Sequence, residues 1–172
     1  MRRLVLTSTM KRVVPLFAAV ALMMVPTTAR AGADAVPFAG TFDGSSTATP
    51  CAPFTICLEG SLEGVARHLG RTTMTKSAVV QFTFTPCPGG TGSTFSETIT
   101  LTAANGDTLE ISGTGEACAG GGVSTGSATL TVSGGTGRFA NASGSLSETF
   151  THDLVTGLET LVLTGTISAP GS

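Results

Sequence analysis

The sequence predicts an all-β protein, and three observations lead to this expectation. After residue 31 the chain is dense in Gly, Thr and Ser, has no Trp or Tyr, and is poor in strong helix formers. Hydroxylated and apolar residues alternate with a period of two, as in residues 95–103, 127–132 and 160–167. Such alternation is typical of strands with one buried face. No segment of this part shows a convincing 3.6-residue period, so helices are not expected to form the core.

Eight strands are expected, and short turn-forming segments separate them. Asn105, Gly106 and Asp107 tolerate the positive φ angles of a tight hairpin. Gly70 and Gly157 supply the same freedom in two other connections. Eight regularly spaced antiparallel strands either close into a barrel or fold as a sandwich. The strands are predicted at about residues 36–43, 56–67, 72–85, 94–104, 108–116, 123–133, 142–152 and 158–168.

The first 31 residues have the pattern of a cleavable signal peptide. Basic residues precede an uncharged run over 13–25, and a small-residue cleavage site ends at Ala31. That run is shorter than the roughly 20 residues of a membrane-spanning helix, and no later segment approaches this length. We therefore expect a signal peptide over 1–31, starting at Met1 or at Met10, and one domain over 32–172. The mature protein is predicted to be extracellular or periplasmic, without a stable membrane anchor.

Removal of the signal peptide would leave a strongly acidic chain. Four Lys and Arg residues would remain against all 11 Asp and Glu residues, which gives a net charge of −7. So few cations do not neutralise a phosphate backbone, and nucleic acid is not an expected partner.

All four cysteines lie in the predicted mature part, which suits an oxidising compartment. Their spacing contains no C-x₂-C pair, so a zinc site is not expected. Three pairings are formally open to Cys51, Cys57, Cys87 and Cys118. In an up-and-down order these residues follow the first, third and fifth strands and so meet at one end. This favours Cys51–Cys57 within the first connection and Cys87–Cys118 between nearby connections.

Four ionisable residues fall in register with the apolar face of their strands: Lys76, Glu97, Glu148 and Glu159. Burying such groups is costly unless they are paired or hydrogen-bonded. One interpretation is that they line a ligand cavity, with Glu148, Glu97 and Lys76 as the candidate binding residues. The alternative is that they reach water at strand ends, or that Lys76 pairs with a glutamate.

A second candidate site is the only local basic cluster, formed by Arg67, His68 and Arg71. It could attract an anionic ligand, or it could simply solvate one edge of the sheet. His68 and His152 are the only histidines, and each is either an acid–base or metal-binding group or, more commonly for such positions, a surface residue. Arg138 is expected to hydrogen-bond the carbonyl groups of the turn that contains it.

The sixth connection reads GGTGRFANASGSL over residues 134–146. Gly134, Gly135 and Gly137 permit a tight turn between strands that side chains would block, and Phe139 could plug the end of a barrel.

This glycine-rich segment resembles the corresponding stretch of the dirigent and allene oxide cyclase superfamily, which includes small exported bacterial proteins. Residues 67–71 and 103–107 are also similar to segments of those bacterial members. The resemblance implies an eight-stranded antiparallel up-and-down β-barrel, calycin-like, with an apolar interior, over about residues 38–168. Members of the superfamily often form trimers, so it also implies a homotrimer. Its plant members bind hydrophobic intermediates and steer their cyclisation or coupling.

The functional acidic and basic residues of the plant members do not match this sequence securely, so their activity does not transfer. The expected function is binding of a small hydrophobic molecule in the barrel, with no metal and no cofactor. The first alternative is a structural or surface-interaction protein with a filled barrel. The second is a cyclase or isomerase type of enzyme that uses Glu148 or Glu97 as a polarising group.

Overall fold

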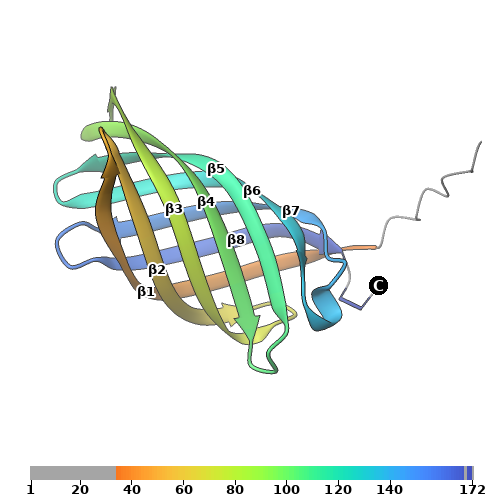
Figure 1. The fold of residues 1–172 in the computed structure, drawn as a ribbon. Helices are drawn as coiled ribbons and strands as arrows, with labels where there is room; N and C mark the ends of the chain where they lie inside the picture. Colours follow the sequence, from red (N-terminus) through yellow and green to blue (C-terminus); the bar gives the residue numbers. More distant parts are fainter. Residues whose placement is uncertain (1–33, 169, 172) are drawn as a thin grey trace, which may run out of the picture. The chain divides into compact units, whose positions relative to one another are not determined.

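The computed structural model describes residues 34–168 and 170–171. The predicted signal peptide over 1–31 lies outside the described residues. In the part described, eight β-strands and one short 3₁₀ helix, η1, account for the secondary structure (Figure 1). None of the helical structure in that part is long and apolar enough to cross a membrane. The elements are β1 (Ala35–Ala52), β2 (Thr55–Ala66), β3 (Gly70–Cys87), β4 (Gly90–Ala103), β5 (Thr108–Gly120), β6 (Val123–Gly135), η1 (Gly137–Phe139), β7 (Gly144–Asp153) and β8 (Leu158–Ser168).

The strands form one antiparallel sheet that closes on itself. Each strand pairs with the next along the chain, and β1 pairs with β8 from Ala35↔Ser168 to Ser45↔Leu158. Closure leaves one inner and one outer face, and alternate residues of every strand point to each. Thr and Ser cover much of the outer face, whereas most residues of the inner face are apolar. The sandwich alternative is therefore wrong.

The first strand is much longer than predicted. Its expected end was residue 43, yet pairing with β2 continues through Gly44↔Leu62 to Ala52↔Thr55. Gly44, Ser45 and Ser46 have the composition of a loop, but as paired strand residues they let β1 run on into a hairpin. The other strand ends lie within a few residues of their predicted positions.

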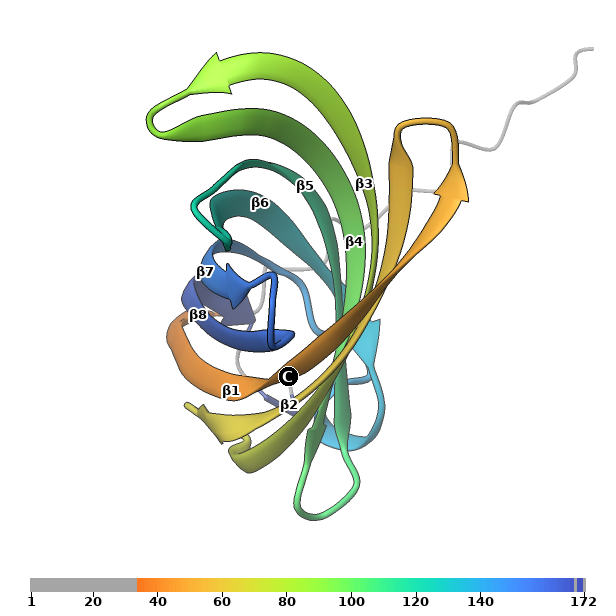
Figure 2. The ribbon, with the colours of Figure 1, turned by 90° about the vertical axis from the view of Figure 1, so that its left-hand side faces the viewer.

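Two hairpins extend beyond the closed part of the sheet. Past Ser45, β1 pairs only with β2, and past Gln81, β3 pairs only with β4. Figure 2 looks onto this end of the sheet, where both hairpins project past the other strands. The rings of Phe54 and Phe84, one from each hairpin, meet edge to face with centroids 5.4 Å apart.

Both disulfide bonds lie at this same end, with the predicted pairing. Cys51–Cys57 links β1 to β2, and Cys87–Cys118 links β3 to β5 across β4. The cysteines occupy strand extensions rather than the loops expected, because β1, β3 and β5 are longer than predicted. We call this the disulfide end.

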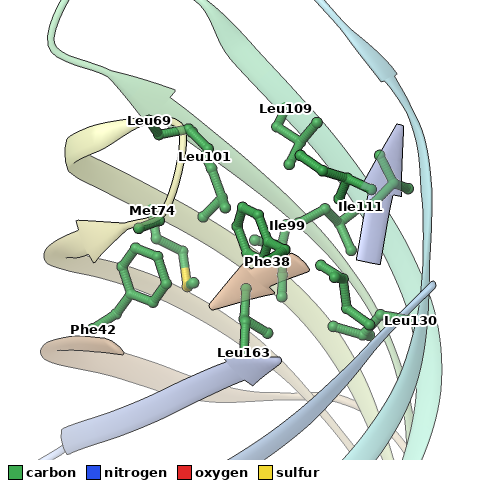
Figure 3. Close-up of a cluster of buried hydrophobic side chains, with 14 of the residues drawn as sticks. Phe38, Phe42, Leu69, Met74, Ile99, Leu101, Leu109, Ile111, Leu130 and Leu163 are labelled. Atoms are coloured by element: carbon green, nitrogen blue, oxygen red, sulfur yellow. The ribbon is translucent and has the colours of Figure 1, made fainter. Parts of the chain in front are cut away.

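Apolar side chains fill the half of the interior away from the disulfide end (Figure 3). Phe139 of η1 is completely buried and Leu69 nearly so, and both belong to the cluster at the connections of this end. The cluster includes Phe38, Phe42, Met74, Ile99, Leu101, Leu109, Ile111, Leu130 and Leu163.

The glycine-rich connection is not the tight turn expected. It passes through η1, and Gly137 adopts a positive φ of 57° at a point where a Cβ would lie 1.9 Å from Asp107 Oδ1. The Arg138 guanidinium pairs with that same carboxylate (Nε–Oδ2 3.2 Å) rather than with carbonyl groups of the turn. Phe139 is thereby held over the apolar core, as a plug.

The two disulfides should contribute unequally to stability because they close loops of different length. Replacing Cys87 and Cys118 with Ser removes a link between residues 31 apart and should lower the free energy of unfolding by about 4 kcal/mol. The same change at Cys51 and Cys57, which are 6 apart, should cost about 2 kcal/mol. Urea denaturation followed by circular dichroism measures both. An equal or larger loss from the shorter link would contradict the loop-entropy explanation.

Candidate functional site

Four ionisable side chains form a polar belt across the interior, next to the filled apolar core. They are the four that the strand register placed on the apolar face: Lys76, Glu97, Glu148 and Glu159. Each is no more than 5% exposed. The alternative in which these groups reach water at strand ends is therefore wrong. Their burial requires partners inside the sheet or altered protonation.

Lys76 and Glu159 are partners. The Lys76 ammonium donates to Oε1 of Glu159, and the Ser46 hydroxyl donates to Oε2. The residues come from β3, β8 and β1, and small Gly60 lies in register between Lys76 and Ser46 on β2. Because a side chain at Gly60 would crowd the Ser46 hydroxyl, the glycine keeps this path open. The Lys76 ammonium also lies 5.3 Å from the centroid of the Phe150 ring.

Glu97 and Glu148 form a second pair, on the strands adjacent to those of Lys76 and Glu159. Glu97 of β4 is in register with Gly113 of β5, and Glu148 of β7 is in register with Ala128 of β6. These small neighbours leave room for the two carboxyl groups to approach. When both groups are ionised, none of their four oxygens has a hydrogen-bond partner, because an ionised carboxylate can only accept and neither group can donate to the other. Once one of them carries a proton, the two groups hydrogen-bond each other.

Burial therefore favours retention of a proton by this pair. Loss of hydration, followed by repulsion from Glu97, raises the pKa of Glu148 to about 9. Loss of hydration also raises the pKa of Glu97, although the charge of Lys76 and the hydrogen bond with Glu148 oppose that rise. Two carboxyl groups this close do not both ionise readily. We assign the proton to Glu148, whose hydroxyl group then donates a hydrogen bond to the Glu97 carboxylate.

A cavity of about 140 Å³ lies between the polar belt and the disulfide end. Lys76, Glu97 and Glu159 line its inner part. Its walls are mostly apolar: Ala48, Ile56, Leu58, Ala78, Val80, Phe82, Phe95, Ala117, Ala119, Phe150 and Leu154. Phe95 and Phe150 meet edge to face with centroids 5.6 Å apart, each two residues nearer the disulfide end than Glu97 or Glu148. Glu148 itself is completely buried and does not line the cavity.

His152 also lines this cavity, contrary to the expectation of a surface residue. It is 6% exposed, and its Nε2 has no hydrogen-bond partner among the described residues. Its register on β7, directly opposite Glu159, places it on the inner face. The sequence held the signal, since Leu146, Glu148, Phe150 and His152 alternate on one face. The expectation of a surface residue rested on the position of His152 at the end of its predicted strand, where side chains commonly reach water.

The second candidate site is separate from the cavity. Arg67 and Arg71 are exposed, and His68 is half-buried with its Nε2 3.1 Å from the carbonyl oxygen of Pro37. All three lie at the end that Leu69 and Phe139 close. Among the described residues neither arginine forms an ion pair, so nothing organises this cluster into a site.

Neither a metal site nor the depression on the outer face competes with the cavity as a candidate site. Within residues 34–168 and 170–171, no group of three or more His, Cys, Asp or Glu side chains is placed to hold a metal ion. A wider depression on the outer face follows β3 to β7, and exposed hydroxyl groups such as Thr94, Ser96 and Thr114 cover it. It is open to water, whereas the interior cavity has buried polar groups that lack partners.

The Glu148 carboxyl group should make stability depend on pH. Its folded pKa is raised, so this contribution is fully present below about 4.5 and is lost as pH rises toward about 9. Glu148→Gln, which mimics the protonated group, should therefore gain stability over the native protein as pH increases from 5 to 8. The slope should approach ~1.4 kcal/mol per pH unit in urea denaturation at each pH. Glu63→Gln, on the exposed face of β2, is the control and should give a constant difference. A constant difference for Glu148→Gln would show that the buried carboxyl group ionises normally.

Comparisons with protein-family models, with curated proteins and with solved structures find no match to this chain. The case for a function therefore depends on the cavity and the polar belt.

Proposed function

We propose that this protein is an exported β-barrel that binds a small, mostly apolar molecule in the cavity at its disulfide end. The observation that carries this proposal is a cavity with apolar walls that also holds buried polar groups with unused hydrogen-bonding capacity. The Nε2 atom of His152 has no partner among the described residues, and Glu97 has only the protonated Glu148. Ligand sites commonly combine apolar walls with a few polar groups that fix orientation. If a side chain of the protein filled this space, the polar groups of Glu97 and His152 could not contact a ligand there.

The size of the cavity limits the ligand. An apolar cavity of about 150 Å³ inside a protein accommodates a molecule the size of benzene. The 140 Å³ here therefore suits one aromatic ring or a short branched chain rather than a long lipid.

The surroundings of the cavity favour an apolar ligand that arrives through the disulfide end. Phe82 and Leu154 line the cavity, and Leu154 is half exposed. Phe54 and Phe84 are well exposed nearby, both with positive φ angles that bulky residues seldom adopt. Such strain persists where surrounding structure holds it and is concentrated at functional sites. The two rings form an apolar rim on the hairpins beside the cavity.

Export and family membership are parts of the same proposal. Two disulfides fit an extracytoplasmic location, and the basic, apolar and small-residue order of residues 1–31 suits a signal peptide. The closed ring of eight antiparallel strands is compatible with the dirigent and allene oxide cyclase resemblance and its homotrimer. Sedimentation velocity of the mature chain would test the assembly.

One observation favours an enzyme as the second candidate. A carboxyl pair that shares a proton beside a cavity can act in general acid–base catalysis, as an isomerase or cyclase requires. The filled-barrel alternative is supported only for the half away from the disulfide end. Binding takes precedence because it needs only the cavity.

Small aromatic probes should stabilise the protein. Toluene, phenol or indole at ten times its dissociation constant should add about 1.4 kcal/mol, which is roughly 4–6 °C in a thermal melt. Ala117→Leu, which fills the cavity, should abolish the shift, whereas Thr114→Leu on the outer face of the same strand should preserve it. No shift with any of the probes would count against a binding cavity.

A further inference from the structure

We propose that the ligand carries a protonated amine on its small apolar body, and that the Glu97 carboxylate recognises this ammonium group. This inference rests on the proposed function, since it names the class of ligand for the same cavity.

Glu97 is the acceptor that the fold leaves only partly satisfied. It lines the cavity and is 4% exposed, and among the described residues the only donor to its two oxygens is the protonated Glu148, which occupies one of them. The carboxylate of Glu159 differs, because Lys76 and Ser46 already donate to its two oxygens. A ligand with N–H donors would therefore find one unsatisfied carboxylate oxygen in the inner part of the cavity. An ammonium group offers three such donors.

The charge of the polar belt also favours a cation. The titratable groups around the inner part of the cavity are Lys76 from β3, Glu97 from β4, Glu148 and His152 from β7, and Glu159 from β8. Among the described residues, β1, β2, β5 and β6 add only hydroxyl, apolar and glycine positions there. With Glu148 protonated, the ammonium of Lys76 faces the two carboxylates of Glu97 and Glu159. A second ammonium would balance this buried negative charge, and paired buried charges are far less costly than single ones.

An anionic ligand would lack a comparable partner. The Lys76 ammonium is held by Glu159 and lies against the ring of Phe150. A carboxylate ligand would therefore bring a second negative charge beside Glu97.

The test compares three probes of nearly equal size on the mature protein: benzylamine, benzyl alcohol and benzoate. Isothermal titration calorimetry at pH 7 gives their dissociation constants. We expect benzylamine to bind at least tenfold more tightly than benzyl alcohol, and benzoate to bind more weakly than both. As the pH is lowered, the preference for benzylamine over benzyl alcohol should shrink, because the carboxyl pair then gains its second proton.

Two matched variants assign the preference to one residue. Glu97→Gln removes the acceptor charge and should reduce benzylamine binding to the level of benzyl alcohol, with benzyl alcohol changed less than twofold. Glu148→Gln can still donate a hydrogen bond to Glu97 and should retain the tenfold preference. The double variant Glu97→Gln/Glu148→Gln excludes compensation by Glu148 and should behave as Glu97→Gln does.

The outcomes separate the two proposals. Equal or tighter binding of benzyl alcohol, or a tenfold amine preference that survives in the double variant, overturns the role of Glu97 and leaves the binding cavity standing. Binding by none of the three probes, nor by toluene or indole, overturns the cavity and the amine inference together. A His152→Gln variant that loses the preference while both carboxyl groups are intact would also overturn recognition by Glu97.

Discussion

The pairing of β1 with β8 is the constraint on which the interior depends. In an open sheet, Lys76, Glu97, Glu148 and Glu159 would lie on one face with access to water, and their charges would cost little. Closure encloses that face, so each of these groups must find a partner, keep a proton or recruit a ligand. The ion pair to Glu159 and the proton shared by the carboxyl groups follow from this enclosure. The unusual chemistry of the polar belt is thus a consequence of topology, since each residue alone is ordinary.

Small residues determine which buried groups meet. The paired side chains sit on strands that are not neighbours, so the residues on the strands between them must be small. Gly60 provides this on one side, and Gly113 with Ala128 provides it on the other. Toward the disulfide end, Gly126 makes room in a different way, because a Cβ there would lie 2.6 Å from the ring of Phe150. The small residues that are so frequent in this sequence therefore shape both the polar belt and the walls of the cavity.

The sequence predicts the periodic part of this structure well. Alternation with a period of two identifies the strands, and the same register assigns the four ionisable residues to the inner face. The parity of the connections predicts both disulfides. What the sequence does not show is contact across the interior: that Glu97 meets Glu148 becomes evident only from the curvature and closure of the sheet.

The predicted end of β1 was wrong because Gly44, Ser45 and Ser46 resemble a loop in composition while tertiary pairing holds them in a strand. The cavity was also hidden, since the same small residues fit a filled or a hollow interior.

The two halves of the interior differ in how they are filled. At the end closed by Phe139, large apolar side chains pack against one another, and this half contributes most of the apolar burial. At the other end, the cavity and its polar belt forgo such packing and bury charge instead. Both disulfides are found there, and so is the contact between Phe54 and Phe84 that joins the two projecting hairpins. Disulfide bonds restrain the unfolded chain without filling the interior. They can therefore offset the packing that is lost at the cavity, whereas an added apolar side chain would occupy the cavity itself. The location of the cysteines is then explained by the cavity beside them, because a hollow end needs a stabilising element that leaves it hollow.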